Sequence, residues 1–155
     1  MSAKQHRLNL VLEDFFAGET QGWGVSQNRW GKLQNQFAIS AHGLWDADRR
    51  ILQLTETYVF DDGHVDVVNW KITREAEQRY VGRESTLVSS AKGEQRNNWF
   101  RWRYRRSVPG KGGSSSTLGF DDCFWLQEDG VLIARASITK LGIEVASMSV
   151  FYRKS

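Results

Sequence analysis

The 155-residue sequence contains one cysteine, one proline and three histidines. A lone Cys123 excludes an intramolecular disulfide and a thiolate-rich zinc site, and it fits a reducing compartment. Such a residue is more often a small buried apolar group than a nucleophile, and the sequence offers it no general base. His42 and His64 lack the His-x-His or His-x-x-x-His spacing of a metal site. We therefore predict neither a metal nor another cofactor.

Long apolar runs are also missing. Residues 1–12 lack the apolar stretch of a signal peptide, and no segment approaches the roughly 20 apolar residues of a membrane-spanning helix. The sequence therefore predicts a cytoplasmic protein without integral membrane contact.

Neither sign of charge is in large excess, since 21 basic residues face 18 acidic ones and the net charge is +3. Residues 99–106 interleave aromatic and basic side chains, as a stacking surface for single-stranded nucleic acid does. Strand periodicity favours another interpretation, in which Phe100, Trp102 and Tyr104 point inward and the arginines point to water. We predict no nucleic-acid partner, because the acidic residues nearly balance the basic ones.

What remains is typical of one globular domain over residues 1–155, with 40% hydrophobic and 25% charged residues. An apolar stripe at i, i+3, i+4, i+7 and i+8, followed by Gly18, predicts one short helix over about residues 8–17. From Gln21 the period changes to two, which predicts strands over about residues 21–153.

Turn-forming clusters divide this region into about nine consecutive strands. They lie at residues 28–31, 46–50, 61–63, 75–78, 92–97, 107–116 and 128–130. The segment 107–116 holds the only proline, three glycines and four serines, and is predicted to be a mobile loop near the barrel mouth. A meander of this length is expected to close on itself, because closure removes the two exposed edge strands. The fold predicted is mainly β, a single closed up-and-down antiparallel barrel of about 8–10 strands.

Alternation places a carboxylate within an apolar row. Leu52, Leu54, Glu56, Tyr58 and Phe60 share one face of a strand. A three-residue loop at residues 61–63 sets Glu56 opposite Val68, so no basic residue faces it directly. Burying a carboxylate in the interior costs free energy unless the group is paired. Many active sites nevertheless use a buried carboxylate as a general acid or base, because burial shifts its pKa.

Several blocks carry a family resemblance across nearly the whole chain. They are Phe15-Phe16-x-Gly18, Trp23-Gly24-Val25, Leu54-x-Glu56-x-Tyr58-x-Phe60-Asp61-Asp62-Gly63, Trp70, Phe120-Asp121-Asp122, Ile133-x-Arg135-Ala136-Ser137 and Thr139-Lys140-x-Gly142. In these blocks the chain resembles the DUF3833 family, an uncharacterised bacterial lipocalin-like domain. The resemblance implies a lipocalin-like (calycin) barrel and names no substrate.

The chain departs from the family pattern at three points. Family members often carry an export or lipoprotein signal, which is not seen here. Arginine is common where this chain has Val68, and tryptophan is common where it has Cys123. Gly22-Trp23 also resembles the short Gly-x-Trp signature of lipocalins, in which an arginine, here Arg153 or Arg135, packs across the tryptophan.

Two alternatives are open for the acidic residues. Glu56 is either a functional acid or base, or one half of a structural ion pair with Arg135, Lys140 or one of the arginines at 101, 103 and 105. Asp121 and Asp122 point to opposite faces of one strand, so at most one enters the barrel, and a salt bridge at the rim is the favoured role. Arg135 and Lys140 either bind an anionic head group or neutralise these carboxylates.

The leading hypothesis is a module that binds a small lipophilic or aromatic ligand, with an anionic head group, inside the barrel. An aromatic wall is expected from Phe37, Ile39, Tyr58, Phe60, Trp70, Phe100, Trp102, Tyr104 and Phe124. The ligand-binding residues predicted are Glu56, Tyr58, Phe60, Trp70, Trp102, Tyr104, Asp122, Arg135 and Lys140.

Two further hypotheses stay open. A cofactor-free isomerase, cyclase or hydratase would use Glu56 as its acid or base in the same cavity. A filled barrel would act through its outer surface as a structural or interaction protein. A monomer and a homodimer are both compatible with the sequence.

Overall fold

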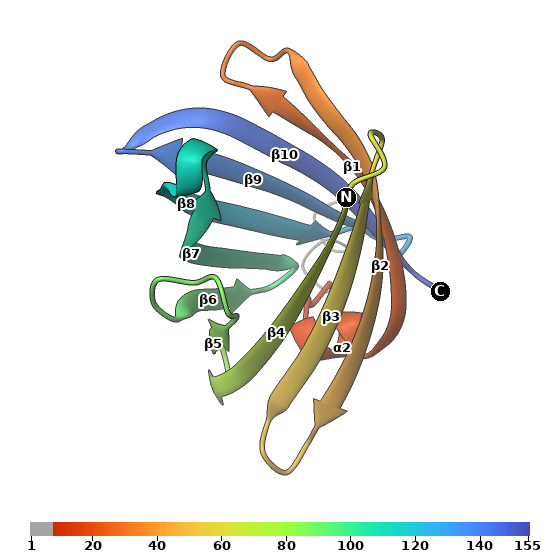
Figure 1. Ribbon diagram of the computed structural model, residues 1–155. Coiled ribbons are helices and arrows are strands. Elements are labelled where there is room, and N and C mark those ends of the chain that lie inside the picture. Colours follow the sequence, from red (N-terminus) through yellow and green to blue (C-terminus); the bar gives the residue numbers. More distant parts are fainter. Residues whose placement is uncertain (1–7) are drawn as a thin grey trace.

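The computed structural model describes residues 8–155, which form a closed antiparallel barrel with one short helix (Figure 1). Each strand pairs with its sequence neighbours, and β1 pairs with β10 to close the ring. The strands described are β1 Gly18–Asn28, β2 Leu33–Asp46, β3 Ile51–Phe60, β4 Val65–Ala76, β5 Arg79–Arg83, β6 Ala91–Arg96, β7 Trp99–Pro109, β8 Ser115–Leu126, β9 Leu132–Lys140 and β10 Ile143–Lys154. The closed barrel predicted from periodicity is confirmed.

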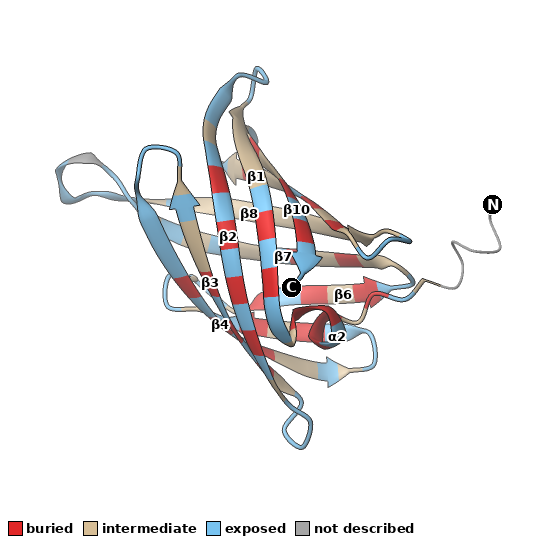
Figure 2. Ribbon diagram, turned by 90° about the vertical axis from the view of Figure 1, so that its right-hand side faces the viewer, coloured by how far each residue is buried: buried red, intermediate tan, exposed pale blue. Residues whose placement is uncertain are grey.

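The register predicted around the Asp-Gly turn is confirmed as well. The backbone N–H of Phe60 donates to the carbonyl of His64 across 2.9 Å, and Glu56 lies opposite Val68. Buried and exposed residues alternate along β2, as Figure 2 shows, with Phe37, Ile39 and Ala41 turned to the core. Period-two patterning therefore locates the interior of the barrel.

The prediction of a turn at residues 92–97 is wrong, because most of this segment is β6. Lys92, Glu94 and Arg96 are outward-facing and make the strand look like a polar loop, whereas Ala91 and Gln95 are buried. A turn at residues 97–98 follows β6, and a longer connection, which we call the mouth loop, lies before it at residues 84–90. Its backbone is held to β7, where Val88 N–H donates to the carbonyl of Arg105.

The segment 107–116 is less of a loop than predicted. Val108 pairs with Ser116 and Pro109 with Ser115, so β7 and β8 continue through most of it. Gly112 and Gly113 have φ values of 67° and 77°, which lets the chain reverse within a few residues. Three of the four serines, Ser107, Ser115 and Ser116, are therefore strand residues.

The helix α2, Leu12–Phe16, is shorter than the predicted span of 8–17. The backbone N–H of Leu10 donates to the carbonyl of Asn97 across 2.7 Å, which holds the preceding residues outside the helix. Of the predicted apolar stripe, Leu12, Phe15 and Phe16 are buried, whereas Leu8 and Val11 are half-buried.

The helix closes one end of the barrel (Figures 1 and 2). A Cβ on Gly43 of β2 would lie 1.9 Å from the carbonyl oxygen of Phe16, so only glycine permits this approach. Glu13 accepts hydrogen bonds from Arg74 of β4 at 2.9 Å and from Tyr80 of β5 at 2.6 Å. Lys154 of β10 donates to the carbonyls of Asp14, Phe15 and Ala17.

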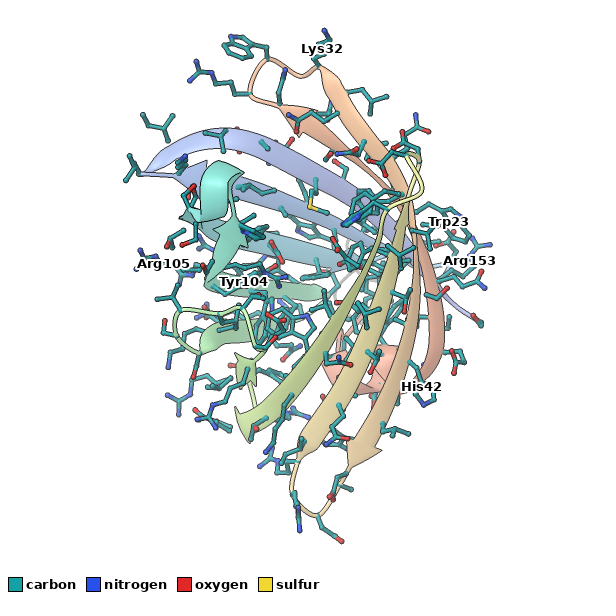
Figure 3. The ribbon with its side chains drawn as sticks, viewed as in Figure 1. Trp23, Lys32, His42, Tyr104, Arg105 and Arg153 are labelled. Carbon is teal, nitrogen blue, oxygen red and sulfur yellow. The ribbon has the colours of Figure 1, made fainter. Side chains whose placement is uncertain are left out.

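Trp23 lies on the outer surface of the barrel and is 53% exposed. Figure 3 shows Trp23, His42 and Arg153 pointing away from the barrel. Phe151 lies directly opposite Trp23, and Arg153, one of the two arginines expected beside it, lies opposite Gln21. Trp23 instead belongs to an outer apolar row that crosses directly paired strands, namely Trp99, Trp125, Ile133, Phe151, Trp23, Ala38, Val59 and Val65.

Candidate functional site

The barrel contains a cavity of about 240 Å³, whose closed end is formed by Leu12 and Phe16 of α2. Its wall is mostly aromatic and consists of Tyr58, Phe60, Trp70, Phe100, Trp102, Tyr104, Phe120, Phe124 and Tyr152, with aliphatic residues between them. Phe37 and Ile39, which we also expected in the wall, are buried in the core beside it. Inward alternation on six strands thus produces an apolar chamber with few polar groups.

Glu56 of β3 is a buried carboxylate in this wall, with 7% of its surface exposed. The Tyr152 hydroxyl donates to Glu56 Oε2 at 3.4 Å, a long and weak hydrogen bond. Burial raises the pKa of Glu56 from 4.5 to about 7, and the charge of Arg106 and the Tyr152 hydroxyl only partly oppose this. Glu56 is therefore poised to gain or lose a proton near neutral pH.

The acidic pair on β8 divides between the two faces of the wall. Asp121 points outward and accepts two hydrogen bonds from Arg101, at 2.9 and 2.6 Å. Asp122 lines the cavity and accepts a hydrogen bond from the Tyr104 hydroxyl at 3.1 Å, on Oδ2. Among the described residues, its buried Oδ1 has no hydrogen-bond partner. Burial, followed by the charge of Glu56, raises the pKa of Asp122 to about 7.

Arg106 is the cation inside the cavity, and the prediction that it points to water with the other arginines is wrong. It lines the chamber, with its guanidinium 5.5 Å from the Tyr104 ring centre and 5.7 Å from that of Phe120. The inward orientation of Arg106 could have been predicted from the sequence. Arg106 continues the parity of Phe100, Trp102 and Tyr104, so period two directs it inward.

The mouth of the cavity carries two more carboxylates. Asp66 of β4 lines it and is paired with His64 at 2.8 Å. Glu84, in the mouth loop, lies 3.9 Å from Arg106. Burial would raise the pKa of Glu84, but hydrogen bonds from Thr86 and the charge of Arg106 hold that pKa below its ordinary value. Glu84 is therefore ionised at neutral pH, and it offsets part of the charge of Arg106.

The ion pairs predicted for Glu56 are not formed. Arg101 binds Asp121 instead. Arg135 borders the cavity but is exposed, at an outward position between Ala134 and Ala136. Lys140 is exposed at the end of β9 and lies outside the cavity lining. From the predicted ligand-binding set, the structure thus brings together Glu56, Tyr58, Phe60, Trp70, Trp102, Tyr104 and Asp122, with Arg135 at the border of the cavity.

The remaining candidates lie on the outer surface. Cys123 is half-buried between strand neighbours Arg101 and Arg135, and burial raises the pKa of its thiol, so it is not an activated nucleophile. His42 pairs with Glu19 on the outer face, where alternation placed it. Within residues 8–155, no group of three or more His, Cys, Asp or Glu side chains could hold a metal ion.

Comparison with known protein families assigns the chain to one of them. The family described as "Protein of unknown function (DUF3833)" matches residues 1–154. The chain belongs to the DUF3833 family. The resemblance inferred from the sequence blocks is thereby confirmed. No curated protein matches the sequence, and in the described part of the chain no helix is long and apolar enough to cross a membrane.

Two solved structures share the fold of this DUF3833 chain. A protein of unknown function from the DUF3598 family of Nostoc punctiforme matches with a TM-score of 0.65 and 12% identity, over 96% of this chain. Our chain spans about half of that protein, 51% of its length. The S-type phycobiliprotein lyase CPES from Guillardia theta matches with a TM-score of 0.65 and 9% identity, over 99% of this chain and 96% of the lyase. At such identities the likeness concerns the fold alone.

Proposed function

We propose that the barrel binds one small lipophilic or aromatic ligand in its cavity. The main support for this proposal is the chamber itself, which is lined by aromatic rings, closed at one end by α2 and about 240 Å³ in volume. Pockets for drug-sized ligands span roughly 300–1,000 Å³, so a compact molecule of about one aromatic ring fits best. The phycobiliprotein lyase likeness supports a barrel of this fold that handles a small, pigment-like ligand.

The open chamber counts against the filled-barrel alternative. An interior packed by its own side chains leaves few voids larger than a water molecule. Here the space corresponds to roughly eight waters at about 30 Å³ each. A chamber of this size in a mostly apolar wall is better explained by an occupant.

Binding is tested with a cavity-filling variant. Ala136 lines the chamber beside Asp122, and Ala136→Phe would occupy the space with a ring. We expect compact aromatic ligands to change the fluorescence of the wild-type protein, because Trp70 and Trp102 line the site. Ala136→Phe should abolish this response, whereas Ala38→Phe on the exposed face should preserve it. Equal binding by both variants would contradict an interior site.

One observation favours a second candidate, catalysis in the same chamber. Glu56 has a pKa of about 7, which suits a general acid or base near neutral pH. A cofactor-free isomerase, cyclase or hydratase would use it to exchange a proton with the bound ligand. Such an enzyme would keep its ligand affinity in Glu56→Gln and lose turnover, whereas a binding protein would show no turnover in either form.

A further inference from the structure

We propose that the polar end of the ligand is a cation, a protonated amine held by Glu56 and Asp122 among the aromatic rings. This inference rests on the proposed function, because it requires that the cavity take a ligand. It replaces the anionic head group expected from the sequence. The two cations expected to hold an anion, Arg135 and Lys140, are both exposed; Arg135 only borders the chamber, and Lys140 lies outside its lining.

The charges facing the chamber favour a cation. Glu56 and Asp122 lie in the wall, and Asp66 lies at the mouth. The opposing charges are Arg106, which is shared with Glu84 at 3.9 Å, and the exposed Arg135 at the border. Tyr58, Tyr104 and Tyr152 also face the site, but burial raises the pKa of each hydroxyl, so they are neutral at physiological pH. Carboxylates therefore outnumber cations around the space a ligand would fill.

The hydrogen bonds of the wall are incomplete on the acceptor side. Asp122 Oδ1 is buried with no partner among the described residues, and Glu56 is 7% exposed with only a 3.4 Å contact from Tyr152. A buried acceptor without a donor is costly, so a ligand that donates N–H groups stabilises both residues. Arg106 Nε is also unpartnered and can donate to a hydroxyl or ring acceptor near the mouth.

The aromatic wall adds a second attraction for a cation. The rings of Tyr58, Trp70, Trp102 and Tyr104 line the same space, and cations bind over such faces within about 6 Å. In the empty chamber the buried carboxylates hold protons near neutral pH, since burial raises both pKa values to about 7. An ammonium group would take the place of one of those protons. Binding is thus coupled to proton release.

The test compares three matched probes, 2-phenylethylamine, 2-phenylethanol and phenylacetate, which share one ring and differ in charge. We expect the amine to bind about tenfold more tightly than the alcohol, as is typical of a hydrogen bond between charged groups, and phenylacetate to bind most weakly. Affinity for the amine should rise by about tenfold per pH unit between pH 5 and 7, and level off above pH 8. Affinity for the alcohol should not rise in this way.

Neighbouring aspartates supply the matched variants. Asp122→Asn, inside the chamber, should remove the preference for the amine, whereas Asp121→Asn on the outer face should retain it. Glu56→Gln gives an independent version of the same test should Asp122→Asn fold poorly. If phenylacetate or the alcohol bound as tightly as the amine, the proposal of a cationic ligand would be wrong. The proposal that the cavity binds a ligand would still stand. Failure of all three probes to bind would overturn both.

Discussion

Glu56 shows how one buried residue links pH to stability. Its pKa in the folded protein is about 7, against an ordinary value of 4.5. The folded state therefore holds the proton more tightly than the unfolded state does. The stability associated with that proton is complete below about pH 4.5 and is lost as the pH rises through 7.

We expect Glu56→Gln to stabilise the ligand-free protein at pH 8 and to have little effect at pH 4. A pKa increase from 4.5 to about 7 corresponds to roughly 3 kcal/mol above both values. Because the amide must still be desolvated, the expected gain is about 2 kcal/mol in the free energy of unfolding. Urea denaturation at the two pH values measures it. Glu75→Gln, at an exposed position, is the control, and an equal gain from both variants would contradict a desolvation cost at position 56.

At the scale of an element, α2 depends on tertiary contacts for its stability. Five residues are too few for a helix to be stable alone. Its buried side chains, the glycine-permitted contact with β2, and the ion pair of Glu13 with Arg74 hold it across the end of the barrel.

Replacing Glu13 should therefore loosen the helix and lower stability. Glu13→Ala leaves Arg74 and Tyr80 without their shared acceptor, and breaking such a buried pair costs about 3 kcal/mol. Thermal unfolding followed by circular dichroism measures the loss. Asp14→Ala changes the adjacent exposed carboxylate and should have an effect below about 0.5 kcal/mol. Similar losses in both variants would show that the ion pair does not hold the helix.

The elements also show which parts of the structure the sequence could predict. Strand faces and the β3–β4 register follow from alternation and one Asp-Gly turn, both of which are local. The start of α2 does not, because it depends on a hydrogen bond from Leu10 to Asn97, far along the chain. The orientation of Arg106 was predictable from parity, since adjacent Arg105 and Arg106 cannot both face water in one strand. The identity of its partner, Glu84 in the mouth loop, required the folded structure.

Across the whole molecule, one pairing decides whether the sheet is closed. β1 and β10 join the two ends of the strand order, and Trp23 lies opposite Phe151 on the outer side of this seam. Both side chains are about half exposed, at 53% and 50%. Their contribution is therefore separable from the packing of the core.

A double-mutant cycle tests the seam. We expect Trp23→Thr and Phe151→Thr each to destabilise the protein modestly, with a coupling energy of about 0.5–1 kcal/mol between them. Urea denaturation of the four proteins measures this coupling. Leu44→Thr, at an exposed site on β2, combined with Phe151→Thr serves as the control and should be additive. A coupling of zero for Trp23 and Phe151 would mean that backbone pairing alone closes the barrel.

The helix across one end of the barrel also has a kinetic consequence. With Leu12 and Phe16 as its floor, the chamber is a pouch and not a channel, so a guest leaves by the route it used to arrive. A ligand that enters or leaves the chamber passes the side chains of Phe60, Asp66 and Arg106. Substitutions there that only widen or narrow the passage will speed or slow arrival and departure together, and the equilibrium occupancy will hardly change.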